Sequence, residues 1–319
     1  MRRAAVWVLH IGSCMDASLP EPLRLKEVPV VLNGGSGDGH GRERAKRLEE
    51  AFREAGLEPR LWPFGPGEEV REVARRALEA RPPVLVAAGG DGTLSAVADV
   101  LRGTDTALGV IPVGTMNHFA KDLGIPLDAG EAAQVIGTGR CIRVDVGEVN
   151  GRTFINNASL GIYADMVRKR ERQQRRLRRS KRSAMLWAAL EVLGRSRLID
   201  LRLEVDGRVQ ECRAPFVFVG NNDYAMEGFV IGTRSRLDGG LLNVYTTRRC
   251  GALGLIGLAL HALFGRLRQA DDFMQWSVPH LRVESPRRRL LVATDGELNS
   301  METPLEFRIR PRSLRVIVP

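Results

Sequence analysis

The stretch V-L-V-A-A-G-G-D-G-T-L-S-A-V, residues 84–97, decides the architecture of this 319-residue chain. It begins as an apolar run typical of a buried strand, passes through Gly89-Gly90-Asp91-Gly92-Thr93, and continues with the apolar spacing of a helix. Glycines at a strand-to-helix turn let backbone N–H groups approach a phosphate, and the helix N-terminus adds a favourable dipole. Because an acid and a hydroxyl lie in the same turn, the stretch indicates metal-bound phosphate rather than a simple turn.

Strands and helices alternate through the first half of the chain. Four apolar runs each predict a strand and are each followed by a segment with helical spacing of apolar residues; they span residues 28–33, 58–64, 83–88 and 107–112. Such alternation, with nearly continuous apolar strands, implies a parallel sheet covered on both faces. We therefore predict a doubly wound α/β domain over residues 28–140, preceded by an unstructured extension over residues 1–27.

The pattern changes to hairpins from about Arg140 onward. Asn150-Gly151 and Asp206-Gly207 each join two strand-like segments, and both dipeptides are strong signals for a tight hairpin turn. More strand candidates follow, including 305–310 and 314–318, and two helical stretches are predicted near 160–193 and 251–269. The prediction for residues 141–319 is an antiparallel β-sandwich, and the chain is long enough for two domains.

Two more polar loops follow predicted strands. The first, residues 33–39, is neither a Rossmann fingerprint nor a P-loop, and on its own it is equally compatible with a flexible turn. The second, residues 111–120, reads I-P-V-G-T-M-N-H-F-A. In a doubly wound sheet such loops gather at the carboxyl ends of the strands, where ligands bind. Three loops rich in Gly, Ser, Thr and Asn at one sheet edge favour a nucleotide site over three unrelated turns.

The order N-x-x-S-G, G-G-D-G-T, I-P-x-G-T-x-N-x-F-A and a late D-G-E resembles the diacylglycerol kinase catalytic family, which includes bacterial lipid kinases and the sphingosine kinases. The resemblance covers nearly the whole chain after Val28. It implies an NAD kinase/diacylglycerol kinase-like α/β domain followed by a β-sandwich that takes the lipid. It also implies transfer of the γ-phosphoryl group of ATP, with Mg²⁺, to the hydroxyl of diacylglycerol or a related lipid.

The resemblance also assigns roles to residues. Asp91 would act on Mg²⁺, directly or through water. One carboxylate of the late motif would accept the proton of the lipid hydroxyl, with Glu297 favoured as the base and Asp295 as its metal-side or orienting partner. Taken alone, Asp295-Gly296 also predicts a hairpin turn. The implied nucleotide-binding residues are Asn33, Ser36, Gly37, Gly89, Gly90, Asp91, Gly92, Thr93, Gly114, Thr115 and Asn117.

The chain departs from the usual family pattern at several positions. The usual Asn-Glu after G-G-D-G-T-L is Ser95-Ala96, and the usual Asp after G-T-x-N is His118. Bacterial relatives hold a second-domain metal with an Asp just before Gly-Leu, where this chain has Gly239. Asp238, one residue earlier, is therefore a candidate ligand for a metal that the departure puts in doubt.

Most of the net charge of +10 comes from residues 168–182, which hold ten Lys or Arg and one Glu. An apolar, Trp-containing stretch follows, and basic residues beside such a stretch suit an anionic membrane surface. The alternative is a solvated loop before a core helix. A nucleic-acid binder usually spreads its basic residues over a face with aromatics between them, which this run lacks. The predicted membrane contacts are Arg175, Arg176, Arg178, Arg179, Lys181, Arg182 and Trp187.

Cysteine usage and hydropathy predict the compartment. The four cysteines show neither metal-ligand spacing nor a disulfide framework, which favours a reducing compartment. The longest apolar stretch, residues 251–264, is too short to span a bilayer. We expect a cytoplasmic protein at the inner face of the cell membrane, with a lipid substrate and anionic phospholipid head groups as partners and no nucleic acid. A homodimer is left open.

Two alternatives accompany the lipid kinase hypothesis. An NAD kinase-like activity shares the G-G-D-G motif but is disfavoured by the segments at 111–120 and 295–297. A non-catalytic lipid or nucleotide sensor that retains the fold is favoured by Ala96, His118 and Gly239.

Overall fold

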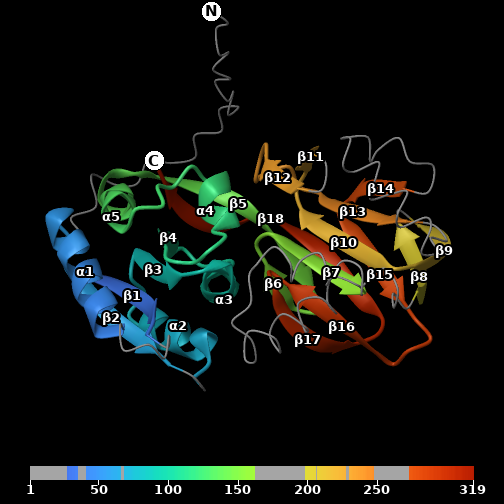
Figure 1. Cartoon of the computed structure of the whole chain (residues 1–319), viewed down its shortest axis with the longest axis horizontal. Helices are drawn as coiled ribbons and strands as arrows, with labels where there is room; N and C mark the ends of the chain where they lie inside the picture. The colour runs from blue at the N-terminus through green and yellow to red at the C-terminus, as the bar shows by residue number, and fades with distance from the viewer. Residues whose placement is uncertain are drawn as a thin grey trace, which may run out of the picture.

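A computed structural model describes residues 27–34, 41–65, 68–161, 198–205, 207–227, 230–247 and 273–319. The helices gather in one half of the molecule and most antiparallel strands in the other (Figure 1). Several sequence predictions lie outside the described residues: those for Ser36, Gly37, the basic run at 168–182, Trp187, the helical stretch near 251–269, the helical stretch near 160–193 from residue 162 onward, and the extension over 1–27 up to residue 26.

The N-terminal half is a parallel sheet between two helical layers. Its strands lie in the order β2-β1-β3-β4. Helix α1 packs against α5 and α2 against α3, so that both faces of the sheet are covered. The elements are β1 (Val28–Asn33), α1 (Gly41–Glu54), β2 (Pro59–Phe64), α2 (Val70–Leu78), β3 (Val84–Gly89), α3 (Asp91–Leu101), β4 (Ala107–Pro112), α4 (His118–Asp122) and α5 (Ala129–Thr138). The doubly wound prediction is confirmed.

One sheet runs through both halves of the molecule. Strand β18 (Leu305–Val318) pairs in parallel with β4 and antiparallel with both β5 (Arg140–Val149) and β15 (His280–Glu284). Beyond β15 follow β8 (Ile199–Val205) and β9 (Arg208–Ala214). The two strands predicted at 305–310 and 314–318 are therefore one strand, whose pairing with β5 shifts register between Arg310 and Leu314.

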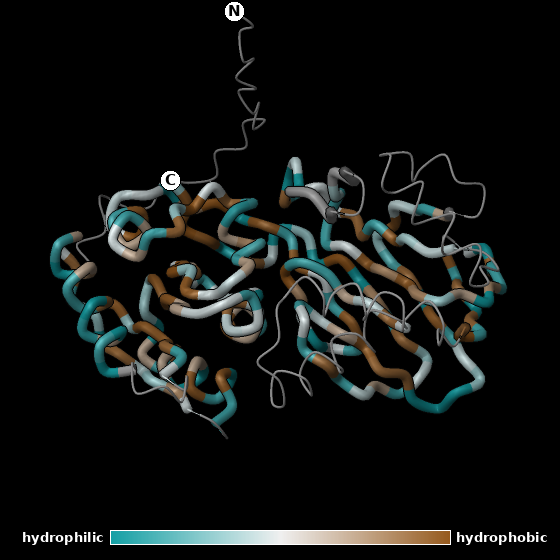
Figure 2. The backbone as a smooth tube through the Cα atoms, in the orientation of Figure 1, coloured by the Kyte–Doolittle hydropathy of each residue, from teal (hydrophilic) through white to brown (hydrophobic). Residues whose placement is uncertain are grey.

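A second, antiparallel sheet of six strands packs on this one to form the β-sandwich. Its order is β14 (Phe273–Val278), β13 (Leu242–Thr247), β10 (Phe216–Asn221), β7 (Asn157–Gly161), β16 (Arg289–Thr294) and β17 (Glu297–Glu302). Buried side chains from both sheets, such as Val219 and Phe307, fill the space between them. Hydrophobic residues occur along many strands of both halves (Figure 2). The sandwich prediction is confirmed, although residues 160 and 161, predicted as helical, end strand β7.

Short hairpins complete the described fold. The turn at Asn150-Gly151 joins β5 to β6 (Arg152–Phe154), and Gly207 lies between the paired strands β8 and β9. A separate two-stranded ribbon, β11 (Tyr224–Glu227) and β12 (Val230–Arg234), packs against α4. In the described part of the chain, no helix combines the length and apolarity needed to cross a membrane.

Candidate functional site

The loops after β3 and β4 touch each other through glycines. A Cβ added at Gly114 would lie 2.5 Å from the Cα of Gly90, so the two backbones are too close for any side chain there. A Cβ at Gly89 would lie 2.4 Å from the Cβ of Thr93, whose buried side chain packs on that glycine. The predicted nucleotide-binding loops therefore meet at the carboxyl edge of the sheet, with Asn33 at the end of the neighbouring strand β1.

Asn117 shapes the loop after β4. It has a left-handed backbone (φ 50°) and is buried. Its side-chain Oδ1 accepts a hydrogen bond from the N–H of Gly114 (3.0 Å), and its Nδ2 donates to the carbonyl of the same residue (2.9 Å). The side chain thus closes the turn that presents the exposed Thr115.

Asp91 joins the first turn of α3 to the start of α4. Its carboxylate accepts hydrogen bonds from the backbone N–H groups of His118 (3.3 Å) and Phe119 (3.2 Å) and from Nδ2 of Asn156 (3.4 Å). These bonds satisfy donors at the N-terminus of α4 that have no partner within the helix. They also fix the orientation of the Asp91 carboxylate beside the glycine loops.

Asp295 lies in the hairpin turn between β16 and β17, where it and Gly296 have φ values of 48° and 84°. Its carboxylate accepts backbone N–H bonds from Ile155 (2.7 Å), Asn156 (2.8 Å) and Asn157 (3.0 Å), and it is also bonded to the Ser95 side chain. Exclusion of water by the surrounding protein raises the pKa of Asp295 to about 6 despite these donors. Asp295 therefore both forms the predicted hairpin turn and places its carboxylate among these hydrogen-bond donors.

The side chain of Glu297 reaches from the β-sandwich to the N-terminal half of the molecule. A Cβ added at Gly92, in the first turn of α3, would lie 3.0 Å from Oε1 of Glu297. The other oxygen, Oε2, accepts a hydrogen bond from Nη2 of Arg152 (2.7 Å). The Glu297 side chain is 45% exposed, so this carboxylate can be reached from outside. The two acids of the D-G-E motif thus occupy different surroundings, one enclosed by donors and the other open.

Asn156, which sequence reasoning did not single out, contacts both halves of the site. Its N–H donates to Asp295 and its Nδ2 to Asp91. Its carbonyl accepts a bond from the hydroxyl of Tyr224 (2.8 Å), and its Oδ1 accepts one from Nη2 of Arg234 (2.9 Å). The only signal in the sequence was an Asn-Asn pair directly after a predicted hairpin arm.

The residues around Asp238 do not fit the second-domain metal that the family resemblance implies. Asp238 is exposed and accepts a hydrogen bond from Nε of Arg236 (3.1 Å). A Cβ at Gly239, where relatives have the Asp, would lie 2.7 Å from Oδ1 of Asn222. Across the described ranges, no group of three or more His, Cys, Asp and Glu side chains is arranged to hold a metal.

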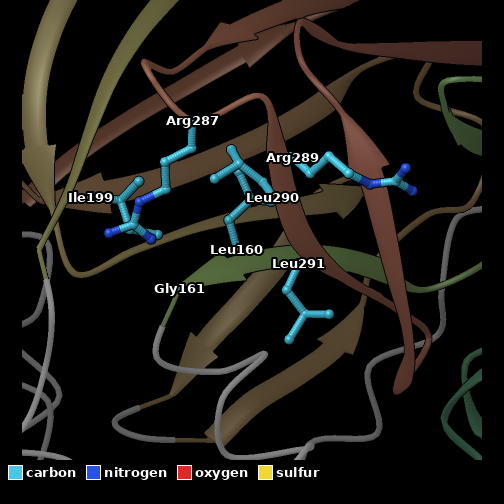
Figure 3. Close-up of a pocket in the computed structure, with 7 residues that line it drawn as sticks. All are labelled: Leu160, Gly161, Ile199, Arg287, Arg289, Leu290 and Leu291. Carbon is cyan, nitrogen blue, oxygen red and sulfur yellow. The ribbon is translucent and has the colours of Figure 1, made fainter.

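A small cavity opens at the far end of β7 from the carboxylates, with a volume of about 90 Å³ (Figure 3). Its lining residues are Leu160, Gly161, Ile199, Arg287, Arg289, Leu290 and Leu291. The side chain of Arg289 turns away toward β17, where Nη2 donates to the carbonyl of Ser300 (2.8 Å). None of the residues that line the cavity belongs to the carboxylate cluster of Asp91, Asp295 and Glu297, so the cavity is not part of the candidate site.

Comparison with known proteins defines the class. Residues 27–149 match the diacylglycerol kinase catalytic domain, and residues 158–318 match the YegS C-terminal NAD kinase beta sandwich-like domain. The chain therefore belongs to the diacylglycerol kinase catalytic family. This confirms the resemblance read from the ordered motifs.

Similar proteins span nearly the whole chain. A probable lipid kinase YegS-like protein of Pseudomonas aeruginosa is 32% identical over 308 residues, covering 92% of this chain and 94% of the relative. A diacylglycerol kinase of Bacillus subtilis is 27% identical, covering 92% and 97%. The crystal structure of a diacylglycerol kinase from Bacillus anthracis superposes with a TM-score of 0.67 at 19% identity, covering 93% and 98% of the two chains, and so shares the fold.

Proposed function

We propose that the protein is an ATP-dependent lipid kinase that transfers the γ-phosphoryl group to the hydroxyl of diacylglycerol or a related lipid. One observation carries the proposal: the β-sandwich places one carboxylate against the glycine-rich turn after β3 and links a second carboxylate to that turn through Asn156. Glu297 lies against Gly92, and Asp295 is linked to Asp91 through Asn156. A lipid hydroxyl bound beside Glu297 would have this carboxylate as its proton acceptor. The glycine-rich turn after β3 would hold the phosphate close by. The names of the two relatives support a lipid acceptor.

Glu297 is the better placed of the two acids to act as the base. A hydroxyl is a poor nucleophile, so a nearby carboxylate must take its proton as the new P–O bond forms. Glu297 is half exposed and can reach a bound substrate. Asp295 already accepts bonds from three backbone N–H groups and is bonded to Ser95, which suits an orienting role.

A single carboxylate at the glycine turn, that of Asp91, fits Mg²⁺ in its usual protein setting. Mg²⁺ keeps several waters and binds one or two carboxylates together with substrate phosphates rather than a dedicated cage of side chains. Asp91 would hold it, directly or through water, and the backbone N–H groups of the glycine loops would face the phosphates. When bound, the ion would neutralise charge on the transferring phosphoryl group.

We further propose that residues 168–182 hold the enzyme on anionic phospholipid at the inner face of the membrane. Each Lys or Arg near such a surface contributes roughly 1 kcal/mol, so even half of this run would suffice for binding. Sedimentation with vesicles of phosphatidylcholine alone or with phosphatidylserine tests this. Binding that needs the anionic lipid and disappears when the run is neutralised is the expected result.

The kinase itself is tested by incubation with labelled ATP, Mg²⁺ and micelles carrying diacylglycerol, monoacylglycerol, ceramide or sphingosine, with NAD⁺ in a separate arm. We expect label in one lipid, and none with the Asp91→Ala variant. Asp105→Asn is the matched control, because this carboxylate is 97% exposed and lies near Arg315, outside the site. Label in NAD⁺ alone, or ATP binding without transfer to any acceptor, would overturn the proposal.

A further inference from the structure

A fully buried arginine lies at the junction of the two halves. Arg234 ends strand β12, and its side chain is 0% exposed. Its guanidinium donates through Nε to Asp122 (2.8 Å), through Nη1 to the carbonyl of Ile155 (2.6 Å), and through Nη2 to Oδ1 of Asn156 (2.9 Å). A buried charge is retained only when it is paired and hydrogen-bonded in this way.

On the nucleotide side, Arg234 holds the end of α4. The Asp122 carboxylate accepts both the side-chain Nε and the backbone N–H of Arg234 (3.2 Å). The opposite end of this five-residue helix is held by Asp91, through the N–H groups of His118 and Phe119. A shift of Asp122 would therefore move helix α4, and with it the N–H groups that hold the Asp91 carboxylate.

On the side of the β-sandwich, Arg234 holds the segment at 155–156 that donates hydrogen bonds to Asp295. Ile155 and Asn156 accept bonds from the guanidinium through oxygen atoms, and the same two residues donate their N–H groups to the Asp295 carboxylate. Asn156 also donates to Asp91. The hydrogen bonds thus form a closed ring: Asp91 is bonded to the start of α4, the end of α4 to Arg234, Arg234 to Asn156, and Asn156 to Asp91.

Two aromatic rings fix the orientation of the guanidinium. Its central carbon lies 5.4 Å from the ring centroid of Tyr224 and 5.9 Å from that of Phe119. Tyr224 is the cross-strand partner of Arg234 in the ribbon, and its hydroxyl donates to the carbonyl of Asn156. The planar guanidinium makes its hydrogen bonds through three nitrogen atoms. The single ammonium of a lysine could not replace it without losing some of them.

We propose that Arg234 is a positioning residue for phosphoryl transfer, which sets the Asp91 carboxylate relative to the Asp295 carboxylate across the two halves. This inference rests on the proposed kinase function. It concerns the transfer step more than ATP binding, because the guanidinium contacts neither the glycine loops nor Glu297 by any described bond.

The decisive variant is Asp122→Asn with Arg234→Met. Removing Arg234 alone leaves a buried, unpaired carboxylate, whereas the double change removes both charges and keeps an oxygen for the backbone N–H at position 234. We expect kcat to fall about 30-fold or more while the KM for ATP changes less than about threefold. Arg234→Lys is expected to fold and to lose about tenfold in kcat, because the charge stays but the fork is lost.

Amide hydrogen exchange gives a readout that does not depend on activity. Exchange at Ile155, Asn156 and Asn157 is expected to accelerate about tenfold or more in the double variant, with the β8–β9 hairpin unchanged. The matched control is Arg71→Met with Asp99→Asn, an ion pair of the same length (2.8 Å) but only partly buried, which joins α2 to α3. This control is expected to keep the wild-type kcat once the folded fraction is taken into account.

A folded double variant with wild-type kcat and wild-type exchange at 155–157 would overturn the proposal. So would a control variant that loses kcat to the same extent, because the effect would then follow from lost stability alone. If the wild-type protein phosphorylates no lipid, the kinase proposal fails by itself. The exchange measurement then still decides whether Arg234 orders the segment that binds Asp295.

Discussion

Asp295 and Glu297 are two residues apart, yet their surroundings differ. The turn places one carboxylate among backbone N–H donors and leaves the other at the surface beside Arg152. Pairs of acids whose environments differ in this way are typical of sites that assign different tasks to similar groups.

The Asp295 environment has a consequence for stability. Because its pKa is about 6 in the folded protein and 3.8 ordinarily, the folded state retains a proton that the unfolded chain has released between these values. The free energy of unfolding should therefore decrease as the pH rises from about 4 to about 6. Urea unfolding at several pH values checks this, and Asp295→Asn should lose this contribution. An identical pH dependence in both proteins would contradict the expectation.

Glu297→Gln separates chemistry from folding. The glutamine keeps the shape of the side chain but cannot accept a proton, so transfer to lipid should fall about 10²- to 10⁴-fold. The melting temperature should stay near that of the wild type because the side chain is half exposed. Steady-state kinetics and thermal unfolding of the same preparation measure both. Wild-type turnover in this variant would assign the base elsewhere.

At the scale of elements, the site depends on two loops whose backbones touch. Gly90 and Gly114 leave no room for a Cβ between the turns after β3 and β4. The contact brings the two turns together at one edge of the sheet. Sequence position alone could not show it, because the loops follow different strands.

Gly114→Ala should push these turns apart. With a Cβ placed 2.5 Å from the Cα of Gly90, the loops must move, and we expect ATP affinity to fall about tenfold or more. Gly137→Ala is the matched control, since its Cβ would meet ordinary contacts of 3.5 Å or more inside α5 and should raise stability slightly. Calorimetric titration with ATP measures both variants. Unchanged affinity in Gly114→Ala would show that the loops do not bind the nucleotide together.

The parts of the site that were predicted from the sequence are the local ones. Glycine turns and the hairpins at Asn150-Gly151 and Asp295-Gly296 carry their conformation in adjacent residues, so short motifs reveal them. Asn156 and Arg234 could not be found this way. Asn156 lies 65 residues from Asp91, and Arg234 lies 78 residues from Asn156, so their pairing appears only when the strands are assembled. Ser95, where the family usually has Asn, is likewise explained only by its side-chain hydrogen bond to Asp295, 200 residues away in the sequence.

At the scale of the whole molecule, the two halves share one sheet through β18. This strand pairs with β4 in the N-terminal half and with β15 in the sandwich. Two bodies joined by a shared sheet and by a buried ion pair such as Arg234–Asp122 should lose their structure together.

We therefore expect one cooperative unfolding transition for the full chain. Differential scanning calorimetry should give a calorimetric enthalpy equal to the van't Hoff enthalpy. Residues 28–140 expressed alone should not unfold cooperatively, since the edge of β4 would lack its partner strand. Two separate transitions, or a stable isolated fragment, would show that the halves are independent.

The position of β18 also bears on how the protein is made. Of the described strands, β18 leaves the ribosome last, yet it is the neighbour of β4 in the nucleotide half. The edge of β4 in the N-terminal half therefore stays unpaired while the strands of the sandwich that precede β18 are made. The acids of the sandwich are already translated when β18 closes that edge, so the strand that joins the two halves forms only after the side chains of the candidate site have been made.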